Sequence, residues 1–511
     1  MYRDEGADGD FVMVDTSKLP RRLGPRWRRA NANNAGLRTD EDPTKVERMT
    51  RNLRKAANST SHNKRYKRLQ HARMESRRRW GGGPAWTRPS VAMDPAWSLV
   101  EELEMSRLET FSAEVPEGSD VKLAGTLRAT SESFAGRVLR REPLVRQPGV
   151  NHPFVPTRHD SAMLDLIAED AGTVYATDAA VATLMTARHA LRPWDLVFTV
   201  YGGSTIVMDS RDGAAQAFLE LETVHENSYR PPEAWDAEDI NHAHQMSIEA
   251  ARATRALREA VVDGSSAAAA LPGSGASIEA HPHEAPGLKP ESVLYRYRRF
   301  PLGDDTLVVR TAVHGYEARA SGPDKVFTAA ALPERWARGA KSSEWRKLYA
   351  TRPGDVLLAE IRDNRNKVGR FCASTLLAGA DELKLGFVTR RGRDDPSGHE
   401  VVGMESVSPA KLLHQMSMSQ ENMWGVVRWA VDLVRAKVAD LQAAKQEAGM
   451  LGDAEEDDDD YKYLFMYVPA TEVGGKPGLR VYEIRQSDFA DEEEEEEEEG
   501  AAASASASSR E

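Results

Sequence analysis

Glu360 lies near the end of an apolar run in the sequence LLAEIRDNRNKVGR, which begins at Leu357. A carboxylate there could hold a divalent cation, because such ions prefer hard oxygen ligands, and the ion could activate water for phosphodiester hydrolysis. Such a site needs several carboxylates around one ion, and the nearby Arg362 would repel it. Glu360 therefore leaves two alternatives, a metal ligand of a nuclease or a remnant carboxylate in a protein that holds RNA without cleaving it.

Aromatic and basic residues alternate in the sequence YRYRRFPLGDD, which begins at Tyr295. Successive side chains of a β-strand point to opposite faces. One face would carry Tyr295, Tyr297 and Arg299, and the other Arg296, Arg298 and Phe300. A face of tyrosines and arginine suits stacking on RNA bases and pairing with phosphates. The alternation fits equally a strand whose aromatic side chains enter the core while its arginines face water.

Asp178 lies in the sequence ATDAAVATL, at the expected start of a helix. Aspartate at this position can cap the helix, because its carboxylate accepts hydrogen bonds from the backbone N–H groups of the first turn. The same carboxylate could instead accept hydrogen bonds from the edge of a guanine-like base. The spacing favours the capping role and leaves base recognition as the functional alternative.

Two His-x-His pairs, His242 with His244 and His281 with His283, are further candidates for metal binding. Both lie in polar, irregular segments without a nearby cysteine or an obvious third ligand, so we predict neither a metal site nor a bound cofactor. The one cysteine, Cys372, lies in the apolar sequence RFCASTLLAGA, where a buried structural thiol is expected rather than a nucleophile. A single cysteine also excludes a disulfide within the chain.

Charge is distributed unevenly along the 511 residues, although the formal net charge is −12. Residues 16–90 contain 21 lysines and arginines but five aspartates and glutamates, whereas residues 453–511 contain 20 acidic and five basic residues. We therefore expect a basic arm over residues 1–90, disordered by itself, and an acidic disordered tail over residues 489–511. Such an arm suits nucleic acid or an acidic partner.

Hydrophobic residues make up 40% of the chain, which supports a substantial core in the intervening body, residues 91–488. No apolar run approaches the ~18–20 residues that cross a membrane, and the start MYRDEGADGD lacks the apolar stretch of a signal peptide. The sequence thus predicts a cytoplasmic or nuclear protein without membrane contact. Residues 263–290 are rich in Ala, Gly, Ser and Pro and are expected to form a disordered insert in the body.

Hydrophobic periodicity predicts that the body is a mixed α+β domain. Gly202 and Gly203 join two β-rich runs in an expected hairpin over 194–210. Helices are expected over 161–170, directly after residue 178, over 248–257 and over 420–441. Further strands are expected at 173–177, 292–300, 305–313, 355–363, 383–391, 461–469 and 478–485.

Several stretches together resemble one family, the D subunit of eukaryotic translation initiation factor 3. They are VYATDAAVATLM from residue 174, PWDLVF from 193, YRYRRFPLGDD from 295, LLAGADELKLGFVTR from 376 and NMWGVVRWAVDL from 422. FVMVDTSKLPRR near the start and the terminal acidic run fit the family as well, whereas the Ala-rich insert departs from it. The resemblance covers nearly the whole chain, in order.

The resemblance implies a cup-shaped α/β body, similar to that of enzymes that hydrolyse capped RNA ends. Those enzymes hold a divalent metal with Glu-apolar-Asp on one strand and Glu-apolar-Lys on the next. Here Glu360 and Ile361 match the second motif, but Arg362 replaces its lysine. The strand at 305–313 offers Val309, Arg310 and Thr311 in place of the first motif, so Val309 and Thr311 stand where carboxylates are needed. Glu360, Arg362 and Arg310 are therefore predicted to be a vestigial site without catalysis. The alternative is a metal-dependent decapping hydrolase or exonuclease.

The resemblance also implies a protein that binds the 5′ cap of selected mRNAs and helps to recruit them to the small ribosomal subunit, which favours a cytoplasmic location. Asp178 matches the family's cap pocket, Leu191 and Arg192 depart from it, and the helix at 248–257 lacks the family's Asn-His pair. In this family the N-terminal arm docks on the E subunit of the same complex. A loop called the RNA gate corresponds to residues 218–232, with Phe218, Glu220, Glu222, His225, Glu226, Tyr229, Pro231 and Pro232.

Overall fold

The computed structural model describes much of the predicted body. Described are residues 90–488 except 92, 135–141, 146, 153, 212–223, 230–239, 272–276, 284–286, 338–339, 448–459, 469–476 and 487. The predicted basic arm up to residue 89 and the predicted acidic tail from residue 489 lie outside the described residues.

The larger sheet contains nine strands in the order β1-β16-β15-β6-β7-β5-β10-β9-β2. β5 pairs in parallel with both β7 and β10, and the other neighbours are antiparallel. The strands are β1 (Ser98–Glu104), β2 (Ser119–Gly125), β5 (Val174–Thr177), β6 (Asp195–Tyr201), β7 (Thr205–Asp209), β9 (Leu294–Leu302), β10 (Asp305–Val313), β15 (Tyr461–Val468) and β16 (Gly478–Ile484).

A second sheet contains five strands in the order β11-β12-β13-β14-β3. They are β3 (Glu142–Leu144), β11 (Gly315–Glu317), β12 (Lys325–Pro333), β13 (Glu382–Arg390) and β14 (His399–Val407). A separate parallel pair joins β4 (Val150–Asn151) to β8 (Lys289–Pro290). Because β12 follows β10 with only the short β11 between them, the chain passes directly from one sheet to the other at this point.

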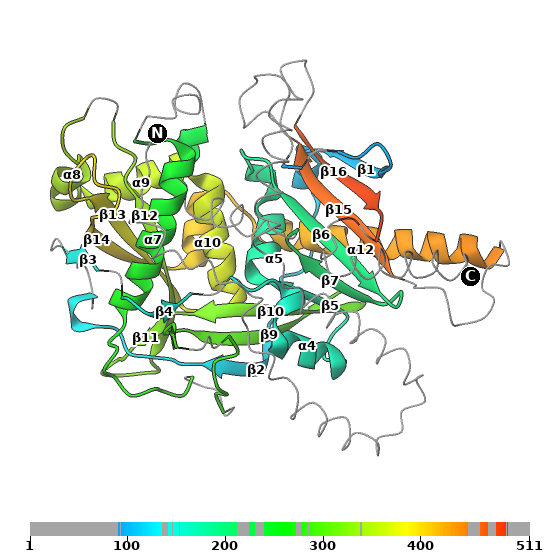
Figure 1. Ribbon diagram of the computed structural model, residues 1–511, viewed down its shortest axis with the longest axis horizontal. Helices are drawn as coiled ribbons and strands as arrows, with labels where there is room; N and C mark the ends of the chain where they lie inside the picture. Colours follow the sequence, from blue (N-terminus) through cyan, green and yellow to red (C-terminus); the bar gives the residue numbers. More distant parts are fainter. Residues whose placement is uncertain are drawn as a thin grey trace, which may run out of the picture.

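Helices fill the space between the sheets and cover their outer faces (Figure 1). The α-helices are α4 (Ser161–Ala168), α5 (Asp178–Met185), α7 (Ala243–Val261), α8 (Trp345–Thr351), α9 (Pro353–Asp363), α10 (Arg365–Leu377), α11 (Pro409–Gln415) and α12 (Gln420–Glu447). The short 3-10 helices are η4 (Arg107–Thr110), η5 (Glu132–Phe134), η6 (Thr157–His159), η7 (Ala187–His189) and η8 (Glu226–Tyr229). No helix in the described part of the chain is long and apolar enough to cross a membrane.

The main hydrophobic core lies between the two sheets. Val309 of β10 and Leu385 of β13 belong to one buried cluster, to which α5, α10 and α12 also contribute. α4 packs on the opposite face of the larger sheet. α7 covers the opposite face of the second sheet. Three layers of helices thus enclose both sheets, and the predicted mixed α+β class is confirmed.

The predicted hairpin and the predicted strand–helix unit are both present. The hairpin forms β6 and β7, and Gly202 and Gly203 take φ angles of 55° and 71° in its turn. Glycine accepts this left-handed conformation because it has no Cβ to clash with the backbone. The stretch 173–191 forms β5 followed directly by α5. Local spacing and turn residues therefore predict these elements correctly.

The predicted strand at 355–363 is wrong, because this stretch belongs to helix α9. Pro353 begins the helix, where proline's fixed φ and missing N–H are tolerated. Val356, Glu360 and Ile361 are its buried residues, at a spacing that places them on one helical face. The short apolar run LLAEI fits either a strand or a helix, and tertiary packing decides between them. Sequence analysis also misses β12 and β14.

The predicted disorder of the insert does not hold for the residues that the structure describes within 263–290. Leu271 is buried in a cluster with Leu127. His283 is 1% exposed, and the Asn151 side chain donates a hydrogen bond to its carbonyl oxygen at 3.2 Å. The low-complexity composition does not predict this order, because it does not show that Leu271, His281 and His283 are buried in the body.

Candidate nucleic-acid interface

A buried ion pair includes Arg310, one of the residues predicted for the vestigial site. Arg310 lies on β10 opposite Thr177 of β5, and its guanidinium contacts Asp160 Oδ2 at 2.9 Å. Asp160 is 0% exposed and also accepts a hydrogen bond from the Tyr297 hydroxyl at 3.0 Å. His283 Nε2 lies 3.3 Å from the same guanidinium nitrogen. β10 therefore carries the permanently charged guanidinium of Arg310, and Asp160, directly before α4, supplies the opposite charge.

The electrostatics of this cluster favour an ionised Asp160. Burial by itself raises the pKa of a carboxyl group, but the charges of Arg310 and His283 and the hydrogen bonds outweigh it, so the pKa of Asp160 is lowered. Burial and the charge of Arg310 lower the pKa of His283 to about 4, against the opposing charge of Asp160. Near neutral pH the cluster thus holds one carboxylate, one guanidinium and a neutral imidazole.

Asp178 is the first residue of α5 and not its N-cap. The preceding Thr177 caps the helix, and its hydroxyl accepts a hydrogen bond from Ala180 N at 3.3 Å. Thr177 therefore has the capping role predicted for Asp178, the next residue. Burial raises the pKa of Asp178, against the charge of Arg310 and a hydrogen bond with Ser374. Because capping does not use this half-buried carboxylate, it can accept hydrogen bonds from a ligand.

The predicted RNA-stacking face of β9 is wrong. Tyr295 and Tyr297 share one side of the strand, as the alternation predicts, but they are 7% and 0% exposed because α4 and the larger sheet enclose them. Arg298 on the other side is buried and donates hydrogen bonds to backbone carbonyls at 2.6 and 2.7 Å. Arg299 is exposed. Since helices cover both faces of β9, the two tyrosines cannot stack on bases in this conformation.

Glu360 is 4% exposed and lies in a second buried polar cluster. Asn364 Nδ2 donates a hydrogen bond to Glu360 Oε2 at 2.7 Å, and His225 Nε2 lies 3.6 Å from Oε1. Lys367 on α10 is 0% exposed; burial lowers its pKa, while the charges of Glu360 and Glu226 act in the opposite direction. Glu360 therefore balances a buried lysine and orients an asparagine.

The three residues predicted to form a vestigial site bind different partners. Arg362 is exposed and pairs with Asp363 at 2.8 Å, whereas Arg310 pairs with Asp160. The prediction placed residues 355–363 on the strand after β10. The strand after β10 is instead β11, which contains Glu317, and the next is β12, whose sequence KVFTAAALP contains no carboxylate.

Part of the predicted gate lies against the same polar cluster. His225 and Glu226 are buried, and Tyr229 ends η8. Glu226 N donates a hydrogen bond to Asn364 Oδ1 at 2.8 Å, and its carboxylate accepts one from Lys367 N at 2.7 Å. These contacts fix residues 224–229 on the junction of α9 and α10. The gate positions outside the described residues are Phe218, Glu220, Glu222, Pro231 and Pro232.

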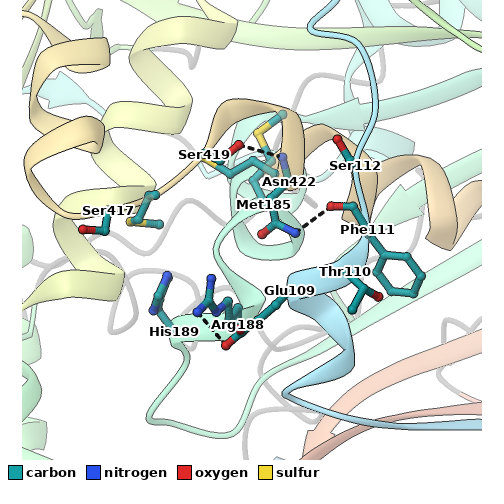
Figure 2. Close-up of a pocket in the computed structure, with 12 residues that line it drawn as sticks. Glu109, Thr110, Phe111, Ser112, Met185, Arg188, His189, Ser417, Ser419 and Asn422 are labelled. Carbon is teal, nitrogen blue, oxygen red and sulfur yellow. Dashed lines mark hydrogen bonds and ion pairs between the residues drawn. The ribbon is translucent and has the colours of Figure 1, made fainter.

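A pocket of about 230 Å³ opens beside the end of α5 (Figure 2). The Asn422 amide of α12 donates a hydrogen bond to the Phe111 carbonyl at 2.8 Å, and Arg188 of η7 forms an ion pair with Glu109 of η4. These contacts hold together the three segments that form the wall. Its lining residues are Glu109, Thr110, Phe111, Ser112, Met185, Arg188, His189, Ser417, Met418, Ser419, Asn422 and Met423.

The predicted cap-pocket residues Asp178, Leu191 and Arg192 do not line this pocket. Leu191 and Arg192 lie shortly after η7, separated from it by Ala190, and Leu191 is 40% exposed. Asp178 stands at the opposite end of α5 from Met185, which does line the pocket. Local sequence patterns do not predict that residues near η4 and at the start of α12 share a pocket, because 311 positions separate Phe111 from Asn422.

The helix expected at 248–257 starts earlier than predicted. α7 begins at Ala243, and an Asn-His pair, Asn241 and His242, stands directly before it. The helix itself contains no Asn-His pair, as predicted, and this pair lies just outside it. Asn241 is buried and donates a hydrogen bond to the Trp336 carbonyl at 2.8 Å, so it also secures the chain after β12.

Within the described ranges, no three or more His, Cys, Asp or Glu side chains are arranged to hold a metal ion. Of the two His-x-His pairs, His281 Nδ1 accepts a hydrogen bond from His283 N at 3.1 Å, and His283 faces Arg310. His242 occupies the N-cap position of α7. Cys372 is buried, and burial raises the pKa of its thiol well above the usual range.

Sequence comparison relates the whole arm and most of the body to one family. A family model described as eukaryotic translation initiation factor 3 subunit 7 matches residues 1–441. The D subunit of this factor from Arabidopsis thaliana is 31% identical over 492 residues, which cover 94% of this chain and 74% of that protein. The chain belongs to the D-subunit family of eukaryotic translation initiation factor 3. The D-2 subunit of Drosophila ananassae is 29% identical over 498 residues, covering 96% of this chain and 84% of that protein.

Membership of this family places the chain in a multisubunit initiation factor with a role in translation initiation. Solved structures of Rai1 are similar to this chain, but at lower sequence identity. Scheffersomyces stipitis Rai1 is 10% identical with a TM-score of 0.42 over 78% of this chain and 94% of that chain. Candida albicans Rai1 is 9% identical with a TM-score of 0.44 over 76% and 95%. Similarity at these scores carries no conclusion about activity or ligands.

Proposed function

We propose that this member of the D-subunit family is a non-catalytic, cytoplasmic RNA-binding protein that holds capped mRNA during its recruitment to the small ribosomal subunit. The observation that carries this proposal is the buried Arg310–Asp160 pair, with 2.9 Å between guanidinium and carboxylate. A metal-dependent hydrolase needs several carboxylates around its ion. Here β10 presents the guanidinium of Arg310 instead, and β12 contains no carboxylate.

The alternative, a metal-dependent decapping hydrolase or exonuclease, predicts that the protein cleaves RNA ends. Our proposal predicts the opposite: no release of cap or nucleotides when the full-length protein is incubated with capped RNA or 5′-phosphorylated RNA in Mg²⁺ or Mn²⁺. Product analysis by thin-layer chromatography checks this expectation. Cleavage that disappears in a folded Glu360→Gln variant would establish the hydrolase.

Asp178 supports the cap-binding part of the proposal. Its half-buried carboxylate lies at the start of α5 and does not cap the helix, because Thr177 does. The guanine base of a cap offers N–H donors along its Watson–Crick edge, which a carboxylate can accept. Arg310 retains Asp160 as its main partner, so Asp178 is not needed to neutralise it.

Asp178→Asn should weaken the binding of the cap analogue m⁷GTP about tenfold, since hydrogen bonds to a charged acceptor contribute roughly 1.5–3 kcal/mol. Stability should change by less than about 0.5 kcal/mol, because Thr177 still caps the helix. Fluorescence titration at one fixed salt concentration measures the affinity. Thr177→Ala is the matched control, which should lose about 1 kcal/mol of stability and keep its affinity. Equal affinity of wild type and Asp178→Asn would remove Asp178 from the cap site.

The basic arm, residues 1–90, is proposed to dock on the E subunit of the factor, as the family resemblance implies. Residues 218–232 are proposed as the RNA gate. The contacts of Glu226 with Asn364 and Lys367 support a fixed point within that gate, at residues 224–229.

A further inference from the structure

Basic residues lie on the elements that form or adjoin the pocket at the end of α5. The elements that carry them are neighbours, because η7 contacts η4 and α10, and α10 contacts α11. We call four basic residues on these elements the rim: Arg107 of η4, Arg188 of η7, Arg365 of α10 and Lys411 of α11, of which Arg188 lines the pocket. On these four elements and the first turn of α12, the acidic residues are Glu109 and Glu421. This concentration of cations contrasts with the net charge of −12 for the whole chain.

The rim cations can be reached by a ligand. Arg107 and Lys411 are exposed. The Arg188 side chain is 34% exposed and pairs with Glu109, which is 51% exposed. Exposed ion pairs of this kind contribute little free energy, so an incoming anion can replace Glu109 as the partner of Arg188. The pair therefore forms an exchangeable wall of the pocket.

The interior of the pocket combines polar and apolar groups. Figure 2 shows Arg188 and His189 on one side and Ser419 and Asn422 on another. Met185 belongs to the apolar part of the lining. Burial and the charges of Arg365 and Arg188 lower the pKa of His189 to about 4, so its imidazole is neutral near pH 7. A volume of about 230 Å³ admits a phosphate group with part of a nucleotide rather than a folded protein element.

We infer that this pocket and its cationic rim bind consecutive phosphates of single-stranded RNA, next to the proposed cap site on the same α5–η7 segment. The inference rests on the proposed RNA-binding function and locates a part of the RNA path. Single charges on several neighbouring elements suit a flexible chain that carries one negative charge per nucleotide. Arg188, on the pocket wall, would contact one phosphate, and Lys411 a neighbouring one.

The double variant Arg188→Gln/Lys411→Gln should bind uncapped, 5′-phosphorylated oligo-uridine roughly 10–30-fold more weakly than wild type at about 0.1 M salt. The slope of log K against log salt should fall by roughly 1.4, because each phosphate contact of a single strand contributes about 0.7. Fluorescence anisotropy of the full-length protein between about 50 and 200 mM KCl measures both. The matched control Arg428→Gln/Lys437→Gln removes two exposed charges from α12, and its affinity should change less than about twofold.

A neutral variant separates the pocket from its rim. Thr110 is exposed and lines the pocket, so Thr110→Trp fills the space without changing charge, and it should also weaken RNA binding. Thermal melting confirms that each variant is folded. The inference would be overturned if wild type binds RNA and the Arg188/Lys411 variant has the same affinity and salt slope as the control variant. That result would leave the proposed function intact. No RNA binding by wild type would instead overturn the proposed function. Equal binding of a poly-glutamate peptide would assign the surface to an acidic protein segment and overturn the RNA assignment.

Discussion

Asp160→Ala should lower the free energy of unfolding by about 3–5 kcal/mol, because it leaves the buried charge of Arg310 without its main partner. Asp160 pairs with Arg310 at 2.9 Å and accepts a hydrogen bond from Tyr297 at 3.0 Å. It also caps α4, accepting a hydrogen bond from Ala162 N at 3.1 Å. Chemical denaturation at pH 7, followed by circular dichroism, measures the loss.

The pH dependence of this loss follows from the lowered pKa of Asp160. A carboxyl group whose pKa is lower in the folded state stabilises the protein above its unfolded pKa of about 3.9. That contribution disappears as the pH falls through the folded pKa. The difference between wild type and Asp160→Ala should therefore be greatest near pH 7 and shrink below about pH 4.

Two further variants separate the contributions of Asp160. Asp160→Asn keeps an acceptor for the α4 cap but loses the charge, so its stability should lie between those of wild type and alanine variant. Asp432→Ala removes an exposed partner of Arg428, 3.4 Å away, and should change stability by less than about 1 kcal/mol. A loss in Asp160→Ala no larger than that of Asp432→Ala would show that the buried pair contributes little.

Glu360→Ala should destabilise the protein by about 3–5 kcal/mol, since it removes a carboxylate that balances the buried Lys367. It also removes the acceptor that holds Asn364 at 2.7 Å, and Asn364 in turn accepts the Glu226 N–H. The segment 224–229 should therefore become less protected against hydrogen exchange. Denaturation and exchange mass spectrometry measure these two effects.

The stability of Glu360→Ala should increase as the pH rises above 7. Burial lowers the pKa of Lys367 and Glu360 opposes this shift, so loss of Glu360 lowers the folded-state pKa further. Between that pKa and the unfolded value of about 10.4, the unfolded chain binds more protons, and stability rises with pH. Asp363→Ala, which removes the partner of the exposed Arg362, should have little effect at any pH. A Glu360→Ala variant as stable as Asp363→Ala would contradict a structural role for Glu360.

The two incorrect site predictions have one physical cause. Alternation correctly places Tyr295 and Tyr297 on one side of β9, but it does not show that α4 covers that side. The run around Glu360 is apolar and short, and such runs fit a strand or a buried helical face equally well. In both cases the local pattern gives the periodicity of the side chains and leaves their neighbours undefined.

Local sequence signals were sufficient for the family, the β6–β7 hairpin, the β5–α5 unit and α12, because turn residues and hydrophobic spacing act over a few neighbouring positions. The roles of the charged residues depend instead on the folded chain. Arg310 meets Asp160 across 150 positions, and Phe111 meets Asn422 across 311. The burial and pKa of a side chain depend on such distant partners, since desolvation and Coulomb energy are set by what surrounds it in space.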